Sequence, residues 1–326
     1  MKVNPSSVVA RVAKSSHNTV ACSPACAAAG YTQCPSFNTL MDNATSVGSL
    51  AMINAIWWNV CNGNSVGYTY SNGYVPSDVW CDNRGGSTTD CSGSNVYYAE
   101  GGGALYPAGT SPMFTISRSN TMRFTTIQKF SIVQSNDNFL ETPSTQWSQI
   151  GSPPHPIWDV SPRDGVSDVS YALQIPNPPL VRNGSVIAGG DFVYDKYGNY
   201  DYAFARTSIG VGPGGMMYLV VADGEGVMGG NGATANQLAH FFRDVLQATT
   251  AMGLDSGLST QMILRGSAGP RRVNTLTGED ATIQIDPYSQ VLDENPGAFG
   301  AVAYYLMFER QAWVNLPRRY KREVWK

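Results

Sequence analysis

The segment past Leu180 constrains the fold most, because turn, strand and helix signals follow one another there at short spacing. Residues 180–188 predict a hairpin around Asn183-Gly184, since Asn-Gly is the strongest short hairpin signal. Residues 206–211 and 216–222 then alternate like two strands, joined by a glycine-rich turn. These paired strands predict a sheet that needs another layer packed against it.

A helix is predicted directly after these strands. Thr234 and Gln237 have the spacing of a capping box, in which each residue satisfies a backbone donor of the other. Gly253 is the expected C-terminal cap. Six apolar residues share one helical face: Leu238, Phe241, Phe242, Val245, Leu246 and Met252. With further strands expected at 261–264 and 299–308, the fold class is α+β, a twisted and largely antiparallel sheet with a packed amphipathic helix.

The middle of the chain is loop-rich. The sequence contains 34 Gly and 19 Pro, and residues 62–109 are dominated by small and polar types. Residues 113–116 and 122–133 have the period-two alternation of half-buried strands. Residues 143–179 are punctuated by prolines and are expected to form an ordered surface excursion rather than a core element.

All cysteines lie in the first 91 residues, which is typical of disulfides that tie down long loops. Zinc is the competing interpretation, but paired CxxC or Cys/His spacing is missing from the sequence. Six cysteines allow 15 full pairings, so no pairing is assigned. They are Cys22, Cys26, Cys34, Cys61, Cys81 and Cys91.

The charge pattern argues against two classes of partner. A net charge of −3 gives no general attraction to nucleic acid or to an anionic membrane, and no apolar run is long enough to span a bilayer. The cysteines favour an extracellular or secreted protein, although residues 1–29 lack the apolar core of a signal peptide. Sequons at Asn43 and Asn183 give weak support for a secreted glycoprotein.

Several motifs, in order, resemble the phosphodiester glycosidase family. AMINAIWWN at residues 51–59 is similar to the family's Asn-Gly-Gly-Phe-Phe segment, and RTSIG at 206–210 to its Arg-Thr-Ala-(Val/Ile)-Gly strand. YLVVADG at 218–224 resembles the Val-Asp-Gly strand end, and LDSGLS at 254–259 resembles Leu-Asp-Gly-Gly-Gly-Ser. The order and spacing of the motifs carry the resemblance, because each one alone is weak.

The resemblance implies hydrolysis of a sugar-1-phosphate diester in an extracellular glycan or polymer. That reaction builds positive charge on the anomeric carbon and releases a phosphate, so it calls for carboxylates near the sugar and donors around the phosphate. Arg206 is the candidate phosphate ligand, and Asp223 and Asp255 are the candidate catalytic carboxylates, with their roles left open. Candidate substrate contacts are Asn54, Thr207, Glu225, Ser256, Gly257 and Ser259.

Departures from the family pattern keep a second hypothesis open. Ser256 and Leu258 replace glycines that permit positive φ and close ligand approach. The alternative is therefore a catalytically degenerate glycan-binding domain, or a structural component of an extracellular assembly or of a virion surface, with self-assembly as a further possibility. The three histidines, His17, His155 and His240, are too scattered for a triad or a metal site.

The predicted organisation has three parts and no required cofactor. Residues 1–45 form a Cys-containing N-terminal segment, and 46–310 a phosphodiester-glycosidase-like domain with loop-rich insertions at 62–179. Residues 311–326 form a basic tail. A divalent cation, calcium or magnesium, held by carboxylate oxygens is compatible with the aspartates. The expected partner is a carbohydrate or glycosyl-phosphate substrate.

Overall fold

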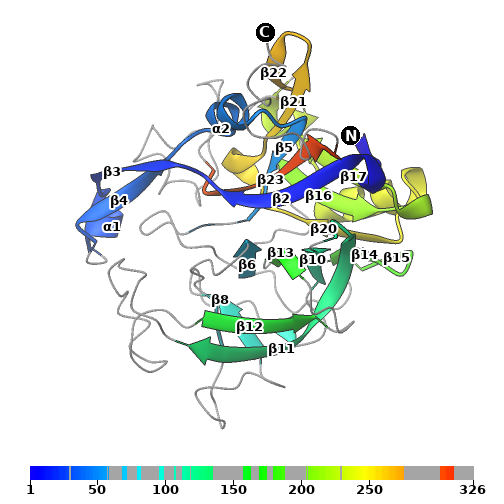
Figure 1. Cartoon of the computed structure of the whole chain (residues 1–326), viewed down its shortest axis with the longest axis horizontal. Coiled ribbons are helices and arrows are strands. Elements are labelled where there is room, and N and C mark those ends of the chain that lie inside the picture. Colours follow the sequence, from blue (N-terminus) through cyan, green and yellow to red (C-terminus); the bar gives the residue numbers. More distant parts are fainter. Residues whose placement is uncertain are drawn as a thin grey trace.

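The strands, within the part of the chain that the structure describes, form three larger sheets (Figure 1). The computed structural model describes residues 1–28, 31–56, 58, 68–71, 79–81, 95–98, 106–107, 112–117, 119–134, 157–162, 169–174, 179–187, 203, 205–227, 230–274 and 302–311.

Sheet 1 contains the strands predicted at residues 180–188, 206–211 and 216–222, whereas those predicted at 261–264 and 299–308 lie in sheet 2. Its order is β1 (Lys2–Val3), β17 (Met217–Ala222), β16 (Arg206–Val211), β20 (Thr250–Gly253), β14 (Pro179–Arg182) and β15 (Ser185–Val186). Its assigned pairs are antiparallel, which agrees with the predicted α+β class. The Asn183-Gly184 hairpin is confirmed, because φ is 50° at Asn183 and 76° at Gly184.

Sheet 2 packs against sheet 1. Its order is β2 (Val8–Lys14), β23 (Tyr304–Arg310), β5 (Ala51–Asn54), β21 (Met262–Gly266) and β22 (Gly269–Arg272). Period-two alternation sends one face of β23 into the common core and the other toward α2 (Leu40–Val47). Helix α2 was not predicted, although Thr39 and Asp42 form its capping box.

Sheet 3 lies below the other two in Figure 1. Its order is β12 (Ile157–Pro162), β11 (Met122–Gln134), β10 (Pro112–Ser117), β13 (Val169–Gln174) and β6 (Tyr68–Ser71). β10 and β11 confirm the predicted strands. The expected surface excursion at 143–179 is wrong for Leu173, which is fully buried because β13 pairs with β10.

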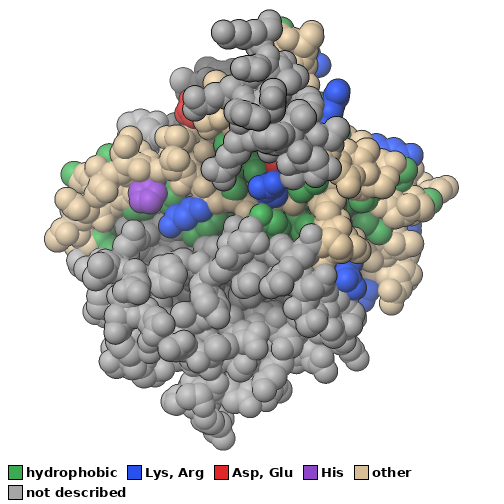
Figure 2. Space-filling view, in the orientation of Figure 1, with side chains coloured by type: hydrophobic (Ala, Val, Ile, Leu, Met, Phe, Trp, Pro, Cys, Tyr) green, Lys and Arg blue, Asp and Glu red, His purple; other side chains and the backbone are tan. Residues whose placement is uncertain are grey.

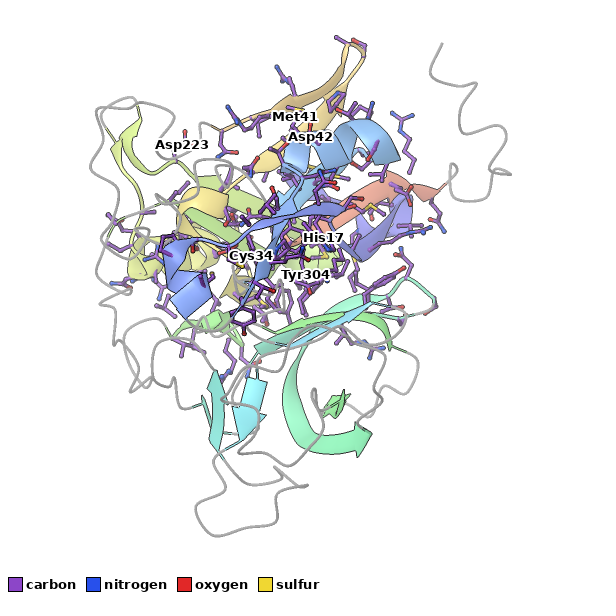
Figure 3. The ribbon with its side chains drawn as sticks, turned by 90° about the vertical axis from the view of Figure 1, so that its left-hand side faces the viewer. His17, Cys34, Met41, Asp42, Asp223 and Tyr304 are labelled. Atoms are coloured by element: carbon purple, nitrogen blue, oxygen red, sulfur yellow. A yellow bond between two sulfur atoms is a disulfide. The ribbon has the colours of Figure 1, made fainter. Side chains whose placement is uncertain are left out.

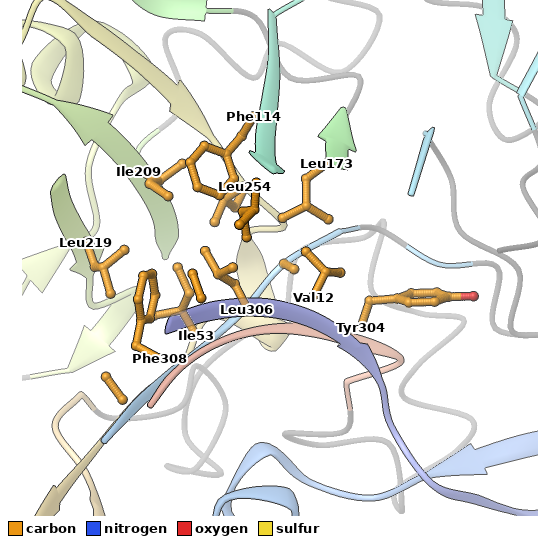
Figure 4. Close-up of a cluster of buried hydrophobic side chains, with 14 of the residues drawn as sticks. Val12, Ile53, Phe114, Leu173, Ile209, Leu219, Leu254, Tyr304, Leu306 and Phe308 are labelled. Carbon is orange, nitrogen blue, oxygen red and sulfur yellow. The ribbon is translucent and has the colours of Figure 1, made fainter. Parts of the chain in front are cut away.

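The main core is the space that the three sheets share. Ile209 and Leu219 of sheet 1, Ile53 and Leu306 of sheet 2 and Phe114 of sheet 3 point toward one another there (Figure 4). All five side chains are fully buried. At about 1.5–3 kcal/mol for each large apolar side chain removed from water, this cluster holds the sheets together.

The predicted helix forms but ends early. α3 (Ala235–His240) has the Thr234–Gln237 capping box, and a π-helical turn at Phe241–Val245 follows. Gln247 then adopts φ 54° and reverses the chain, so Met252 joins β20 instead of the helix and Gly253 ends that strand. The wider π turn also moves Phe241 and Val245 off the buried face. Their side chains are 39% and 64% exposed, respectively.

The N-terminal region contributes strands to sheets 1 and 2 and contains a disulfide. β1 pairs with β17 and β2 with β23, while β3 (His17–Ala21) and β4 (Gln33–Phe37) form a ribbon next to α1 (Pro24–Ala28). A Cys22–Cys34 disulfide joins the two strand ends, and Cys26 is disulfide-bonded as well. The division into three parts stays a prediction.

Shorter elements complete the described residues. They are β7 (Val79–Cys81), β8 (Asn95–Tyr98), β9 (Tyr106–Pro107), β18 (Glu225–Val227), β19 (Gly230–Asn231) and 3-10 turns at Pro5–Ser7, Pro213–Gly215 and Gly257–Ser259. None of the described helices has the length and apolarity of a membrane span. On the face shown in Figure 2, described basic side chains are visible and acidic ones are sparse.

The two sequons differ in accessibility. Asn43 is buried in α2, and its Nδ2 donates to Ser15 Oγ at 2.7 Å and to Thr39 O at 2.9 Å. Asn183 is exposed in the β14–β15 turn. Only the second sequon is accessible for modification in this fold.

Candidate active site

The antiparallel topology of sheet 1 brings the three principal candidates to one edge. β16 lies between β17 and β20 and begins at Arg206, where both neighbouring strands end. Arg206 pairs with Ala222, and Asp223 follows at once. On the other side Leu254 N donates to Thr207 O at 2.7 Å, which extends the β16–β20 register by one pair and places Asp255 opposite Arg206.

The two aspartates therefore flank the strand that carries Arg206. Neighbouring strands lie about 4.8 Å apart, so the backbones at Asp223 and Asp255 are about 10 Å apart across the start of β16. Asp223 is partly exposed at the end of β17, toward the periphery of the view in Figure 3. Asp255 is only 7% exposed. The two carboxylates thus occupy environments of different polarity.

Asp255 has the most perturbed carboxyl group of the candidates. Burial raises its pKa from 3.8 to about 7, while hydrogen bonds from the Ser259 side chain and the Ser256 backbone act in the opposite direction. Burial prevails because desolvation penalises the charged form more than these bonds stabilise it. At neutral pH the group is therefore divided between its acid and its base form, as acid–base catalysis requires.

Asn54 links sheet 2 to sheet 1 and holds the backbone of Asp255 through hydrogen bonds. Its Nδ2 donates to Asp255 O at 2.7 Å, and its Oδ1 accepts from Thr207 Oγ1 at 2.7 Å and from Gln261 N at 3.0 Å. Asp255 N in turn donates to Ala55 O at 3.1 Å. Because Asn54 and Thr207 are 0% exposed, these bonds are shielded from competing water.

The buried network suggests that Asn54 and Thr207 act through Asp255. A direct contact of either residue with substrate stays a prediction. Two residues that were not predicted, Ala55 and Gln261, contribute backbone groups, and a backbone role leaves no signal in residue type.

Arg206 is also anchored. It is 7% exposed, and its Nε donates to the carbonyl of Ala233, the residue before the Thr234 cap of α3. This bond ties the start of β16 to the start of the helix. The guanidinium has a planar arrangement of donors suited to phosphate oxygens, so its fixed orientation fits the predicted role.

The loop after Asp255 contains three further candidates. Gly257 has φ 75°, its N donates to Ala205 O at 2.8 Å, and the space where a side chain would begin is open. Ser256 is extended and its Oγ donates to Leu254 O at 3.0 Å, while Ser259 is partly exposed. The side chains of Leu258 and Glu225 lie outside the described residues.

Within the described ranges, no three His, Cys, Asp or Glu side chains gather as a metal site would require. A divalent cation at the aspartates stays a prediction. The arrangement supplies one carboxyl group that titrates near neutrality, one more exposed carboxylate and one guanidinium, which together suit the hydrolysis of a bond between a sugar and a phosphate.

Comparison with known proteins identifies one matching family. The family model for phosphodiester glycosidases matches residues 85–284, a range that includes Arg206, Asp223 and Asp255. The curated proteins contain no significant match.

Solved structures show a similar fold at low sequence identity. The catalytic domain of zebrafish N-acetylglucosamine-1-phosphodiester alpha-N-acetylglucosaminidase, auto-inhibited by its pro-peptide, aligns at a TM-score of 0.50 and 15% identity over 95% of this chain and 76% of that chain. A hypothetical protein from Synechocystis aligns at 0.47 and 15% over 95% and 58%. A Burkholderia pseudomallei K96243 protein, described by its name as exported, aligns at 0.47 and 14% over 94% and 73%.

Proposed function

The chain belongs to the phosphodiester glycosidase family, and we propose that it hydrolyses the glycosyl–phosphate bond of a sugar-1-phosphate diester. The bond between the anomeric carbon and its oxygen breaks, the oxygen leaves with the phosphate as a monoester, and water supplies the new hydroxyl group. A phosphate monoester is a good leaving group, so the main requirements are activation of water and stabilisation of charge.

Asp255 is the proposed general base. Its buried carboxyl, with a pKa of about 7, removes a proton from the attacking water when it is ionised and still has sufficient basicity to do so. Asp223, on the far side of β16, stabilises the positive charge that develops on the sugar. Arg206 binds the departing phosphate. Ser259 and the Ser256 N–H keep the Asp255 carboxylate oriented toward the reaction.

The observation that carries the proposal is the cross-strand placement of Asp255 opposite Arg206, in a segment that matches the family model. The proposed setting is an extracellular glycan or polymer. Support for it comes from the Cys22–Cys34 disulfide, because disulfides persist mainly in oxidising compartments.

The test is the release of free sugar from UDP-N-acetylglucosamine and from a methyl-phosphate diester of N-acetylglucosamine. Asp255→Asn keeps the shape of the side chain and removes its basicity, so turnover is expected to fall about 10²- to 10⁴-fold. Asp244→Asn is the matched control, because Asp244 is an exposed carboxylate on the π turn, paired with Arg243. It should retain wild-type turnover.

Two outcomes would contradict the proposal. Equal turnover by wild type and Asp255→Asn would remove Asp255 from the mechanism. A folded wild-type protein that cleaves none of a panel of sugar-1-phosphate diesters would favour the alternative, a glycan-binding or structural domain. The replacement of two motif glycines by Ser256 and Leu258 is the observation that supports this alternative.

A further inference from the structure

One face of sheet 1 presents three successive residue pairs between β16 and β20. The innermost pair is covered by the π turn, since a side-chain atom at Gly210 would lie 2.6 Å from Phe242 Cε1. Two residues farther along β16 the next pair lies on the same face, and the outermost pair is charged. The assigned pairs are Gly210–Ala251 and Ser208–Gly253, and the same register, continued past the bond from Leu254 N to Thr207 O, sets Asp255 opposite Arg206.

The middle pair contains a buried hydroxyl group, that of Ser208, without a hydrogen-bond partner among the described residues. Ser208 is 0% exposed, and its Oγ has no hydrogen-bond partner among the described residues. A buried polar group without a partner is destabilising, so such groups are rare in native proteins. The family motif that this strand resembles has alanine at the position of Ser208. Within the described part of the chain, no group therefore accounts for this hydroxyl.

Ser208 has a small neighbour on one side of its strand. Its partner across the ladder is Gly253, which has no side chain and stays partly exposed. On the other side Val220 of β17 packs against the cluster under α3. A ligand would therefore reach the buried Ser208 hydroxyl over Gly253, from the edge where Arg206 and Asp255 lie.

We propose that Ser208 is a phosphate-binding residue, whose Oγ donates a hydrogen bond to a phosphoryl oxygen that Arg206 also binds. Residues i and i+2 of a strand are about 7 Å apart, so the donors of Ser208 and Arg206 can bind two oxygens of one phosphate group. This subsite rests on the proposed function, because it names the second donor for the phosphate half of the same substrate.

The test measures binding of inorganic phosphate without turnover. Phosphate that binds the native state raises the urea midpoint of unfolding in proportion to its affinity. Wild type should be stabilised by phosphate, and Ser208→Ala should bind it about 10- to 100-fold more weakly, as expected for a lost hydrogen bond to a charged group. Without phosphate, Ser208→Ala should be at least as stable as wild type.

A second variant probes the space rather than the hydroxyl. Gly253 is not among the positive-φ glycines, so Gly253→Ala is compatible with the backbone and places a methyl group where phosphate would approach. Gly253→Ala should weaken phosphate binding. Free N-acetylglucosamine should bind Ser208→Ala and Gly253→Ala with the same affinity as it binds wild type.

Three results would overturn the subsite: no phosphate binding by wild type, equal phosphate affinity in wild type and Ser208→Ala, or a Ser208→Ala protein less stable than wild type without phosphate. The last result would show that the hydroxyl has an intramolecular role. Phosphate binding is measured without turnover, so the role of Ser208 can be tested even if the sugar-release assay is negative.

Discussion

Asp255→Asn is expected to stabilise the folded protein at pH 8 while it lowers turnover. In the wild type, burial raises the pKa of the carboxyl from 3.8 to about 7. That rise of about three pKa units corresponds to about 4 kcal/mol, at about 1.4 kcal/mol per unit, by which ionised Asp255 destabilises the native state. Asparagine has no charge to desolvate and still accepts the hydrogen bonds from Ser256 and Ser259.

The sign of the effect follows from proton binding. Because the native-state pKa lies above the unfolded-state value, native Asp255 holds its proton more tightly than the unfolded chain does. Its favourable contribution is complete below pH 4 and is lost as the pH rises to about 7. The stability advantage of Asp255→Asn should therefore be small near pH 4 and grow by about 1.4 kcal/mol per pH unit up to about pH 7.

Urea unfolding at pH 4, 5.5, 7 and 8, with the disulfides intact, measures this difference. Asp244→Asn is the control, since hydrogen bonds from Arg243 and His240 lower the pKa of Asp244 to about 2 and it stays ionised over this range. Its effect on stability should change far less between pH 5.5 and 8 than that of Asp255→Asn. A difference between Asp255→Asn and wild type that does not change with pH would refute the burial argument.

Three further predictions follow from the same contacts. Thr207→Val should lower kcat about tenfold and Thr207→Ser should restore it, because the hydroxyl positions Asn54 and, through Asn54, Asp255. Equal kcat in the two variants would contradict this role of the hydroxyl. Gly210→Ala should destabilise the protein by about 1–3 kcal/mol in urea unfolding, because its methyl group meets the Phe242 ring. The wild-type rate should rise with pH through about pH 7, as a base that must be ionised requires, and a falling profile would assign Asp255 as an acid.

Local signals in the sequence were sufficient for the elements past Leu180. The Asn183-Gly184 turn needs positive φ at both residues, and the Thr234–Gln237 box satisfies backbone donors three residues apart. Each of these devices acts over a few residues, so the sequence reveals it directly.

Features that depend on distant segments could not be predicted. Met252 follows Val245 by seven residues, which is helical spacing, but it lies in β20, because pairing with Ile209 and burial in the shared core prevail over local periodicity. Leu173 follows a proline-rich stretch, and only its pairing with Phe114 places it in the core. The role of Asn54 depends on Asp255, 201 residues farther along the chain.

The loop after Asp255 shows which glycine the backbone itself requires. Only the middle position of the three, Gly257, has a left-handed φ, at 75°, whereas Ser256 is extended at −128°. Serine is therefore compatible with the first position, and its backbone N–H still reaches the Asp255 carboxylate. The loop keeps glycine at the position where a side chain would strain the turn. The Ser256 substitution by itself thus leaves the geometry around Asp255 intact.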